Sequence, residues 1–308
     1  MVWRLSHVLG ASQFDRRLLE EVYTEAEKME FFAKTCPAVN MLQGKILTTL
    51  FYEPSTRTRL SFESAMLRLG GNVISTENAR LFSSVSKGET LEDTIRVING
   101  YSDVIVMRHH EEGAARRASD VSRIPVINAG DGPGEHPTQS LLDLYTIKKE
   151  FGRIDGLSAV MVGDLLNGRT VRSLSQLLTN YHDVKVYFVS PEEIRMREDV
   201  KKLLAEKGVA YEEHGSLNEV LPLADVVYMT RIQKERFKDE NEYLRFKGCY
   251  VLGKENVGLM KPDAIILHPL PRVDEISVDV DDDKRARYFE QAKNGLYVRM
   301  ALLHLLIK

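Results

Sequence analysis

Three hydroxyl side chains and two arginines stand together in the segment STRTR at 55–59. Hydroxyl groups donate hydrogen bonds without carrying charge, and a guanidinium is a planar fork that matches the oxygens of a phosphate. The segment follows an apolar run, ILTTLF at 46–51, which is typical of a buried strand. The residue types therefore predict a site for a phosphate-bearing ligand at the end of a strand. The G-x-x-x-x-G-K pattern of a Walker A loop is absent from the sequence.

A helix is expected to begin directly after this strand. Pro54 disfavours helical backbone at the residue before it, Ser55 suits the N-cap position, and the helix is expected over 56–69 with Gly70–Gly71 at its end. Its first turn offers free N–H groups and the positive end of the helix dipole, which bind anions and disfavour cations. Two arginines in that turn therefore indicate an anionic ligand. The alternative is that Ser55 only caps the helix and the arginines face water.

Further cationic, imidazole, amide and carbonyl groups follow other strand-like runs. They are Arg108 after 104–107, His136 and Gln139 on either side of the helix-starting Pro137, Arg169 after 158–163, Arg231 and Gln233 after 225–230, and HPLPR at 268–272. The prolines of HPLPR lack N–H groups, which leaves carbonyls free to accept from a ligand amine. Each group alone has a structural alternative, such as an exposed arginine or a structural histidine. Their shared position is the stronger signal, because ligands in α/β folds bind outside the carboxyl ends of strands.

The strand-like runs alternate with helical stretches along the chain. The expected strands are 46–51, 104–107, 125–128, 158–163, 184–189, 225–230 and 264–268, and the expected helices include 15–34, 137–151, 169–181, 198–207 and 284–307. This alternation predicts an α/β protein with parallel sheets covered by helices on both faces. The turn-rich segment DGPGEHP at 131–137 marks the change from one α/β unit to the next.

Length and composition limit the remaining classes of protein. A chain of 308 residues is long enough for two domains, and its net charge of −3 provides no basic field for nucleic acid. No apolar run approaches the roughly 18 residues needed to span a bilayer. Cys36 and Cys249 are far apart and lack metal-binding spacing, so both are expected to be reduced thiols. A cytoplasmic protein without nucleic-acid or membrane partners is expected, and prior removal of a transit peptide remains open.

The motifs resemble, in type and order, those of aspartate carbamoyltransferase catalytic chains. They are STRTR at 55–59, KGET at 87–90, MRH at 107–109, HPTQ at 136–139, GRTV at 168–171, TRIQKER at 230–236 and HPLPR at 268–272, and they span nearly the whole chain. STRTR and HPxQ are typical of the wider carbamoyltransferase superfamily, whereas TRIQKER and HPLPR are specific to the aspartate enzymes. Ornithine carbamoyltransferases typically carry S-M-G and H-C-L-P. This chain lacks S-M-G and has Pro269 where that cysteine would be.

The resemblance implies transfer of the carbamoyl group of carbamoyl phosphate to the amine of L-aspartate. The products are N-carbamoyl-L-aspartate and phosphate, early in pyrimidine biosynthesis, and no cofactor or metal is required. It implies two doubly wound parallel-sheet domains, joined by interdomain helices that include the C-terminal helix. Residues 1–136 plus 293–308 would bind carbamoyl phosphate, and 137–292 would bind aspartate. It also implies a homotrimer. Catalytic chains of this family act alone or join regulatory or dihydroorotase-type partners, and the sequence leaves both open.

The resemblance also implies a role for each site residue. Those matched to carbamoyl phosphate are Ser55, Thr56, Arg57, Thr58, Arg108, His136, Gln139 and the carbonyls of Pro269 and Leu270. Those matched to aspartate are Lys87, Arg169, Arg231, Gln233 and Leu270. Four residues are implied to act in catalysis, with Arg57 stabilising the leaving phosphate and Thr58, Arg108 and His136 polarising the carbamoyl carbonyl. Ser83 and Lys87 match a loop that enters the neighbouring subunit's site.

Two alternatives to this activity differ in class. A carbamoyltransferase for another amine acceptor, such as ornithine, is disfavoured because Arg169 and Arg231 would repel a cationic side chain. A non-catalytic protein that kept the fold would have lost site residues, and none of the expected positions is missing from the sequence. The acceptor of the amine proton stays open between the departing phosphate and His136.

Overall fold

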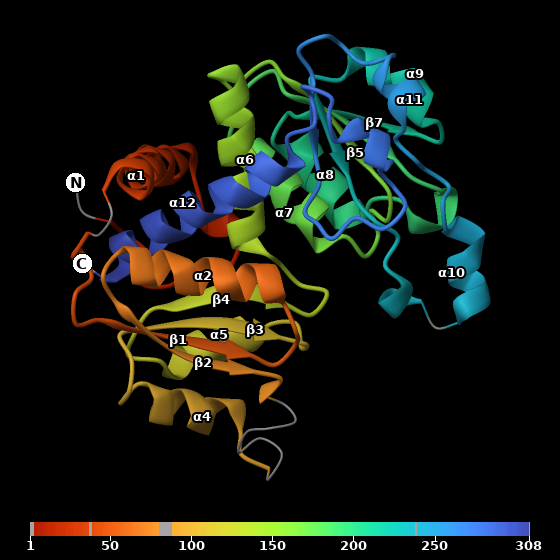
Figure 1. Cartoon of the computed structure of the whole chain (residues 1–308). Coiled ribbons are helices and arrows are strands. Elements are labelled where there is room, and N and C mark those ends of the chain that lie inside the picture. The colour runs from red at the N-terminus through yellow and green to blue at the C-terminus, as the bar shows by residue number, and fades with distance from the viewer. Residues whose placement is uncertain (1–2, 37–38, 80–87, 238, 308) are drawn as a thin grey trace. The chain divides into compact units, whose positions relative to one another are not determined.

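A computed structural model of the chain describes residues 3–36, 39–79, 88–237 and 239–307 (Figure 1). The chain divides into two compact units, unit 1 with Met1–Leu142 and Lys293–Lys308, and unit 2 with Asp143–Ala292. Helices α6 (Pro137–Phe151) and α12 (Tyr288–Ile307) each begin in one unit and end in the other. Each unit contains one parallel sheet, in the order β2-β1-β3-β4 or β7-β6-β5-β8-β9. The expected fold of two parallel-sheet α/β domains connected by helices is therefore confirmed.

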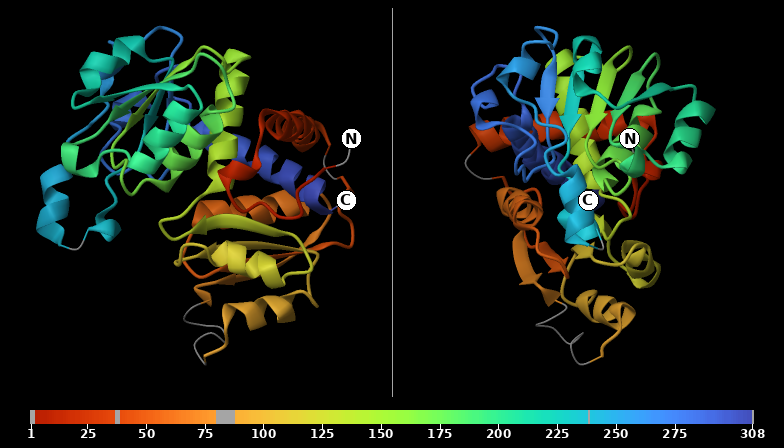
Figure 2. Two further views of the ribbon diagram at one scale, coloured as in Figure 1. Left: turned by 180° about the vertical axis from the view of Figure 1, so that it is seen from behind. Right: turned by 90° about the vertical axis from the view of Figure 1, so that its right-hand side faces the viewer.

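Unit 1 has helices on both faces of its four-stranded sheet. Its elements are η1 (Ala11–Gln13), α1 (Arg16–Thr35), β1 (Ile46–Phe51), α2 (Thr56–Arg68), β2 (Asn72–Glu77), α4 (Leu91–Ile98), β3 (Val104–His109), α5 (Ala114–Val121) and β4 (Val126–Asp131). Helix α2 lies on one face, and α4 and α5 lie on the other (Figure 1; Figure 2, right). On the second face Ile105 and Met107 of β3 pack with Leu91 and Ile95 of α4. Side chains alternate along a strand, so Val104, Val106 and Arg108 of β3 point to the opposite face, where α2 lies.

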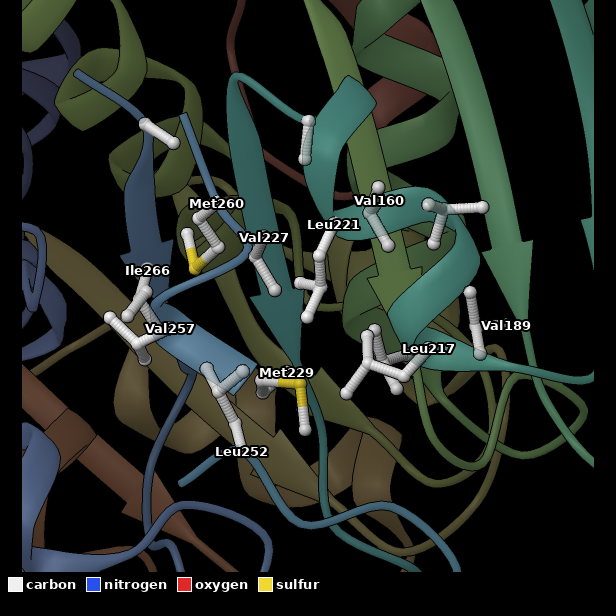
Figure 3. Close-up of a cluster of buried hydrophobic side chains, with 14 of the residues drawn as sticks. Val160, Val189, Leu217, Leu221, Val227, Met229, Leu252, Val257, Met260 and Ile266 are labelled. Carbon is white, nitrogen blue, oxygen red and sulfur yellow. The ribbon is translucent and has the colours of Figure 1, made fainter. Parts of the chain in front are cut away.

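Unit 2 repeats this plan with a five-stranded sheet. Its elements are β5 (Ser158–Val162), α7 (Arg169–Leu178), β6 (Lys185–Val189), η3 (Glu192–Ile194), α8 (Glu198–Glu206), β7 (Ala210–His214), α9 (Leu217–Val220), η4 (Leu221–Leu223), β8 (Val226–Met229), η5 (Lys234–Arg236), α10 (Glu240–Phe246), α11 (Lys254–Val257), β9 (Ile265–Leu267) and η6 (Val278–Val280). Figure 3 shows part of the core on one face, where Val160, Val227 and Ile266 form one row across three paired strands. Leu221 and Met260 cover this row. Continuous burial of this kind is typical of a parallel sheet.

The last helix begins later than expected, at Tyr288 rather than Lys284. The backbone before it pairs with strand β9, because the N–H of Ile266 donates to the carbonyl of Arg285 at 2.7 Å and the N–H of Arg287 donates to Ile266 at 2.9 Å. Backbone groups that pair with a strand cannot also join a helix, which explains the later start.

Two further expectations concern the chain as a whole. Cys36 and Cys249 are both free thiols. Within the residues that the structure describes, no helix is long and apolar enough to cross a membrane.

Candidate active site

In unit 1 the sequence-predicted groups lie at one edge of the sheet. Strands β1, β3 and β4 are parallel neighbours, with Phe51 paired to Arg108 and His109 paired to Asp131. Their carboxyl ends therefore meet at the same edge. The segment 55–58 follows β1, Arg108 lies near the end of β3, and His136 follows β4. The structure thus brings together the residues assigned to carbamoyl phosphate in this unit.

Helix α2 begins at Thr56, as predicted, but Ser55 does not cap it. Ser55 occupies the N-cap position, yet its hydroxyl makes no capping hydrogen bond. By contrast, the hydroxyl of Thr90 accepts the N–H of Asp93 at 3.1 Å at the start of α4. The predicted N-cap position of Ser55 and the start of the helix are therefore confirmed, but the alternative that Ser55 only caps the helix is not supported, because its hydroxyl makes no capping bond. The first-turn N–H groups have no partner within their own helix by geometry, which suits them to an anion.

The two arginines of the segment differ in their surroundings. Arg59 is held by acidic groups of its own unit, with Glu77 at 3.1 Å and Glu63 at 3.4 Å. Arg57 is exposed at the start of α2, and Thr58 beside it is buried. The exposed Arg57 therefore fits the role expected of a phosphate-binding arginine, whereas Arg59 ties α2 to neighbouring carboxylates of its own unit.

Arg108 lies within strand β3 and not after it, because the strand continues to His109. Its guanidinium donates to the carbonyl of Ala129 at 3.3 Å and approaches Glu53 at 3.5 Å. These two contacts fix the half-buried side chain at the edge where β1 and β4 end. Hydrogen-bond donors held in this way need little reorganisation to bind a developing negative charge.

His136 and Gln139 lie at the start of α6, and both are buried. The carbonyl of His136 accepts the N–H of Gln139 at 3.0 Å, which begins the helix. The preceding loop is held by Asp131, whose carboxylate accepts the N–H of Glu135 at 2.8 Å and that of Gly113 at 2.9 Å. Asp131 therefore supports the loop that carries His136, although the sequence pattern did not single it out.

The neighbouring His109 gives unit 1 a pH-dependent stability. Burial first, and then the charge of His110, lower the pKa of His109 from 6.5 to about 4. The unfolded chain therefore binds a proton between pH 6.5 and 4 that the folded chain does not bind. This contribution to stability is fully present above pH 6.5 and is lost as the pH falls through the folded-state pKa.

Replacing His109 with asparagine is expected to make stability less dependent on pH in this window. Asparagine keeps an acceptor near the position of Nδ1, which accepts the N–H of Glu111 at 3.0 Å, but it does not titrate. Urea unfolding midpoints of both proteins at pH 7 and pH 5 measure the effect. An equal fall of the midpoint in parent and variant would contradict this assignment.

In unit 2 the predicted residues also lie at the carboxyl ends of neighbouring strands. Strands β5, β8 and β9 are adjacent and parallel, with Val162 paired to Met229 and Tyr228 paired to Leu267. The residues assigned to substrates in this unit are Arg169 at the first position of α7, Arg231 and Gln233 after β8, and Pro269 and Leu270 after β9. The structure therefore brings this second group together at one edge of the five-stranded sheet.

Asp164 connects two of these strand ends and was not predicted. Its buried carboxylate accepts the backbone N–H of Asn167 at 3.0 Å and also a backbone hydrogen bond from Gln233. Burial raises the pKa of Asp164, although these hydrogen bonds and the charge of Arg236 act in the opposite direction. Asp164 lies two residues after the end of β5, as other site residues lie shortly after their strands, so its position was the available signal.

Ser83 and Lys87 lie outside the described residues, so their expected role in a neighbouring site remains a prediction. Within the described ranges, no group of three or more His, Cys, Asp or Glu side chains is arranged to hold a metal ion. The groups that are present suit small anions. Guanidinium, hydroxyl and helix N-terminal donors in unit 1 match a phosphate beside a carbonyl, and two guanidinium groups with an amide in unit 2 match a dicarboxylate.

Two parallel sheets with anion-binding groups after their strands define an α/β protein that is suited to bind small anionic ligands. A family model described as "Aspartate/ornithine carbamoyltransferase, carbamoyl-P binding domain" matches residues 6–149. A second, described as "Aspartate/ornithine carbamoyltransferase, Asp/Orn binding domain", matches residues 155–306. The chain belongs to the aspartate/ornithine carbamoyltransferase family.

Individual relatives agree with the resemblance seen in the motifs. The chain is 59% identical to the chloroplastic aspartate carbamoyltransferase of Arabidopsis thaliana, over 99% of this chain and 78% of that protein. The solved catalytic subunit of Methanocaldococcus jannaschii aspartate transcarbamoylase has 52% identity and a TM-score of 0.92, with 98% of each chain covered. The Trypanosoma cruzi aspartate transcarbamoylase in complex with carbamoyl phosphate and aspartate has 41% identity and a TM-score of 0.93, over 98% of this chain and 97% of that one.

Proposed function

We propose that the chain is an aspartate carbamoyltransferase, which transfers the carbamoyl group of carbamoyl phosphate to the amine of L-aspartate. The observation that carries this is the name shared by relatives that are 59% and 53% identical over nearly the whole chain. Structures of a further relative with carbamoyl phosphate, aspartate and N-(phosphonacetyl)-L-aspartic acid support the same substrates. The groups at the two sheet edges are chemically suited to them.

The proposed roles follow the chemistry of each sheet edge. In unit 1 Ser55, Thr56 and Arg57 bind the phosphate. Thr58, Arg108 and His136 polarise the carbamoyl carbonyl through hydrogen bonds to its oxygen. Gln139 and the carbonyls of Pro269 and Leu270 bind the carbamoyl NH2 group. In unit 2 Arg169, Arg231 and Gln233 bind the carboxylates of aspartate. We assign residues 1–136 plus 293–308 to carbamoyl phosphate and 137–292 to aspartate, which the descriptions of the two family models support.

The reaction needs no covalent intermediate on the protein. The aspartate amine attacks the carbamoyl carbon, the C–O bond to phosphate breaks, and phosphate leaves. Orientation of two bound substrates and stabilisation of the charge that develops on the carbonyl and phosphate oxygens supply the rate enhancement. The departing phosphate accepts the amine proton, and His136 remains a neutral donor to the carbonyl.

A comparison of amine acceptors tests the proposed function. Phosphate release from carbamoyl phosphate is measured with aspartate, with ornithine and with neither. Release that depends on aspartate is expected, because the guanidinium groups of Arg169 and Arg231 repel the cationic side chain of ornithine. Release with ornithine alone would overturn the assignment of the acceptor, and no release with either would overturn the assignment as an enzyme.

Replacing His136 with asparagine tests the role of its imidazole. We expect a lower kcat, by roughly tenfold to a hundredfold, because one donor to the carbonyl is weakened. The pH dependence of kcat is expected to keep both limbs of the parent, since the imidazole is not the titrating base. Disappearance of one limb in the variant would instead identify His136 as the proton acceptor.

A homotrimer with shared sites is also proposed, with Ser83 and Lys87 acting in the neighbouring subunit. Exposed apolar side chains on unit 1 support an interface: Leu60 and Leu67 lie two turns apart on α2 and are 52% and 60% exposed, and Ile74 on β2 is 48% exposed. Mass measurement of the assembly tests the trimer. Mixing inactive Arg57→Ala and Lys87→Ala chains should restore activity if the sites are shared, and no recovery in confirmed mixed trimers would contradict sharing.

The cellular setting remains a proposal. The cytoplasm is the location proposed from the sequence, whereas the Arabidopsis relative is chloroplastic. Fractionation of source cells, with detection of this chain by an antibody, distinguishes the two locations. Co-purification of the native complex from the same cells tests for regulatory or dihydroorotase-type partners. A purified complex that contains only this chain would indicate a catalytic trimer without regulatory or dihydroorotase-type partners.

A further inference from the structure

The segment after β9 is closed into a loop by one buried pair, His268 and Glu275. Nε2 of His268 lies 2.6 Å from Oε1 of Glu275, and the two residues are 2% and 5% exposed. The other carboxylate oxygen, Oε2, accepts the backbone N–H groups of Val273 and Asp274, both at 3.1 Å. The carboxylate of Glu275 therefore connects His268, at the start of the segment, with the backbone near its end.

The second ring nitrogen of His268 acts on the residues assigned to the substrate. Nδ1 accepts the backbone N–H of Leu270 at 2.8 Å, so Nδ1 carries no proton and Nε2 is the nitrogen that donates to Glu275. Burial of Glu275 opposes its charge, but hydrogen bonding and charge from His268 lower the pKa of Glu275 below its usual value. Glu275 is therefore ionised at neutral pH, and it fixes both the tautomer and the ring orientation of His268.

The N–H of Leu270 and the carbonyl of Pro269 belong to the same peptide group. This peptide bond is trans, because the only cis bond within the described residues joins Leu270 to Pro271. In a planar trans peptide the N–H and C=O point in opposite directions. The hydrogen bond to Nδ1 of His268 therefore turns the Pro269 carbonyl away from the imidazole and fixes its direction.

The start of the segment is also held from its backbone side. The N–H of His268 donates to Oε1 of Gln291 at 2.8 Å, and Nε2 of Gln291 donates to Asp143 at 2.5 Å. The hydroxyl of Tyr228 donates to the other oxygen of Asp143 at 2.7 Å. All these residues are buried in unit 2. His268 therefore has little freedom to move, and its ring is a rigid support for the peptide group that follows.

We propose that Glu275 and His268 are positioning residues for carbamoyl transfer, which hold the Pro269–Leu270 peptide so that its carbonyl receives the carbamoyl NH2 group. This inference rests on the proposed function, because that function assigns the two carbonyls to the substrate. Neither side chain is required to touch a substrate. Their effect is on the direction of a backbone acceptor, and such acceptors must be placed within a fraction of an ångström to be effective.

Two substitutions of His268 separate positioning from general stability. His268→Asn places an acceptor near Nδ1 and keeps the contact with Leu270, whereas His268→Gln places its amide near Nε2 and keeps the contact with Glu275. We expect His268→Gln to lower kcat/KM for carbamoyl phosphate by about tenfold to a hundredfold, and His268→Asn by less than about tenfold. Thermal unfolding midpoints of the two variants are expected to fall by similar amounts. A purely structural role predicts equal kinetic losses.

A matched control exists in unit 1. His304 and Glu25 form a pair with the same 2.6 Å separation, outside the residues assigned to substrates. Glu25→Gln is expected to lower the unfolding midpoint without changing kcat/KM, whereas Glu275→Gln is expected to lower kcat/KM by about tenfold. If His268→Gln does not fold, the comparison of Glu25→Gln with Glu275→Gln tests the positioning role instead.

The outcomes separate this inference from the proposed function. An unmodified chain that forms no carbamoyl aspartate would overturn the proposed function and the positioning role with it. An active parent whose His268→Asn and His268→Gln variants have equal kcat/KM would overturn the positioning role alone. Unchanged kcat/KM in a folded Glu275→Gln variant would do the same.

Discussion

Replacing Arg57 with alanine is expected to lower kcat by about a hundredfold or more while leaving the unfolding midpoint nearly unchanged. Arg57 is exposed in the first turn of α2, where the helix dipole disfavours a cation. Because the side chain is exposed and stands where the dipole disfavours it, its removal is expected to affect stability much less than catalysis. In the reaction the same guanidinium is proposed to stabilise the charge on the departing phosphate, and that stabilisation is lost completely. Steady-state kinetics and thermal unfolding of the same preparation measure both effects.

Arg68 provides the control for this prediction, because it lies in the last turn of the same helix and is also exposed. Arg68→Ala removes the same side chain at the opposite end of α2 and is expected to keep the parent's kcat. If Arg57→Ala lost activity and stability in equal proportion, its effect would be structural and the phosphate-binding role would be withdrawn. Equal losses of kcat in both variants would indicate a general requirement for charge on α2.

Much of the fold was predictable because central parallel strands are continuously apolar. Strand β1 has the predicted bounds, and every predicted strand is present. Strands β2 (Asn72–Glu77) and β7 (Ala210–His214) were not predicted. Both are edge strands, with sequences NVISTE and AYEEH, and most of their residues are exposed or half-buried. An edge strand in contact with solvent does not require an apolar run, so its sequence carries little of the strand signal.

The site was predictable to the extent that position along the chain determines position in space. In a parallel sheet the carboxyl ends of all strands lie at the same edge. The position of Arg108, His136 and Arg231 relative to their strands is therefore enough to assign each of them to that edge of its sheet. Supporting contacts could not be found in this way. Glu275 lies seven positions after His268 and bonds to it across a turn, and Ser55 occupies an N-cap position without making a capping hydrogen bond. Such contacts depend on loop conformation, which residue types and spacing do not determine.

Replacing Arg231 with alanine is expected to lower kcat/KM for aspartate by roughly a hundredfold to a thousandfold. The half-buried side chain lies two residues after the end of β8 and is proposed to bind a substrate carboxylate through two charge-assisted hydrogen bonds. The KM for carbamoyl phosphate is expected to change little, because most of the groups assigned to that substrate belong to unit 1. Arg231→Lys should recover only part of the loss, since an ammonium keeps the charge but not the planar fork.

Arg245 on α10 is the matched control within unit 2. It is exposed and forms a 3.0 Å ion pair with Glu193, so Arg245→Ala removes a guanidinium from the same unit without touching the proposed site. Such exposed pairs contribute little to stability, and both kinetic constants should remain those of the parent. If Arg231→Ala weakened carbamoyl phosphate binding as much as aspartate binding, the division of substrate recognition between the two units would be wrong. A loss of kcat/KM that is selective for aspartate would instead support that division. Aspartate carries two carboxylates that the guanidinium of Arg231 can bind, whereas carbamoyl phosphate carries none.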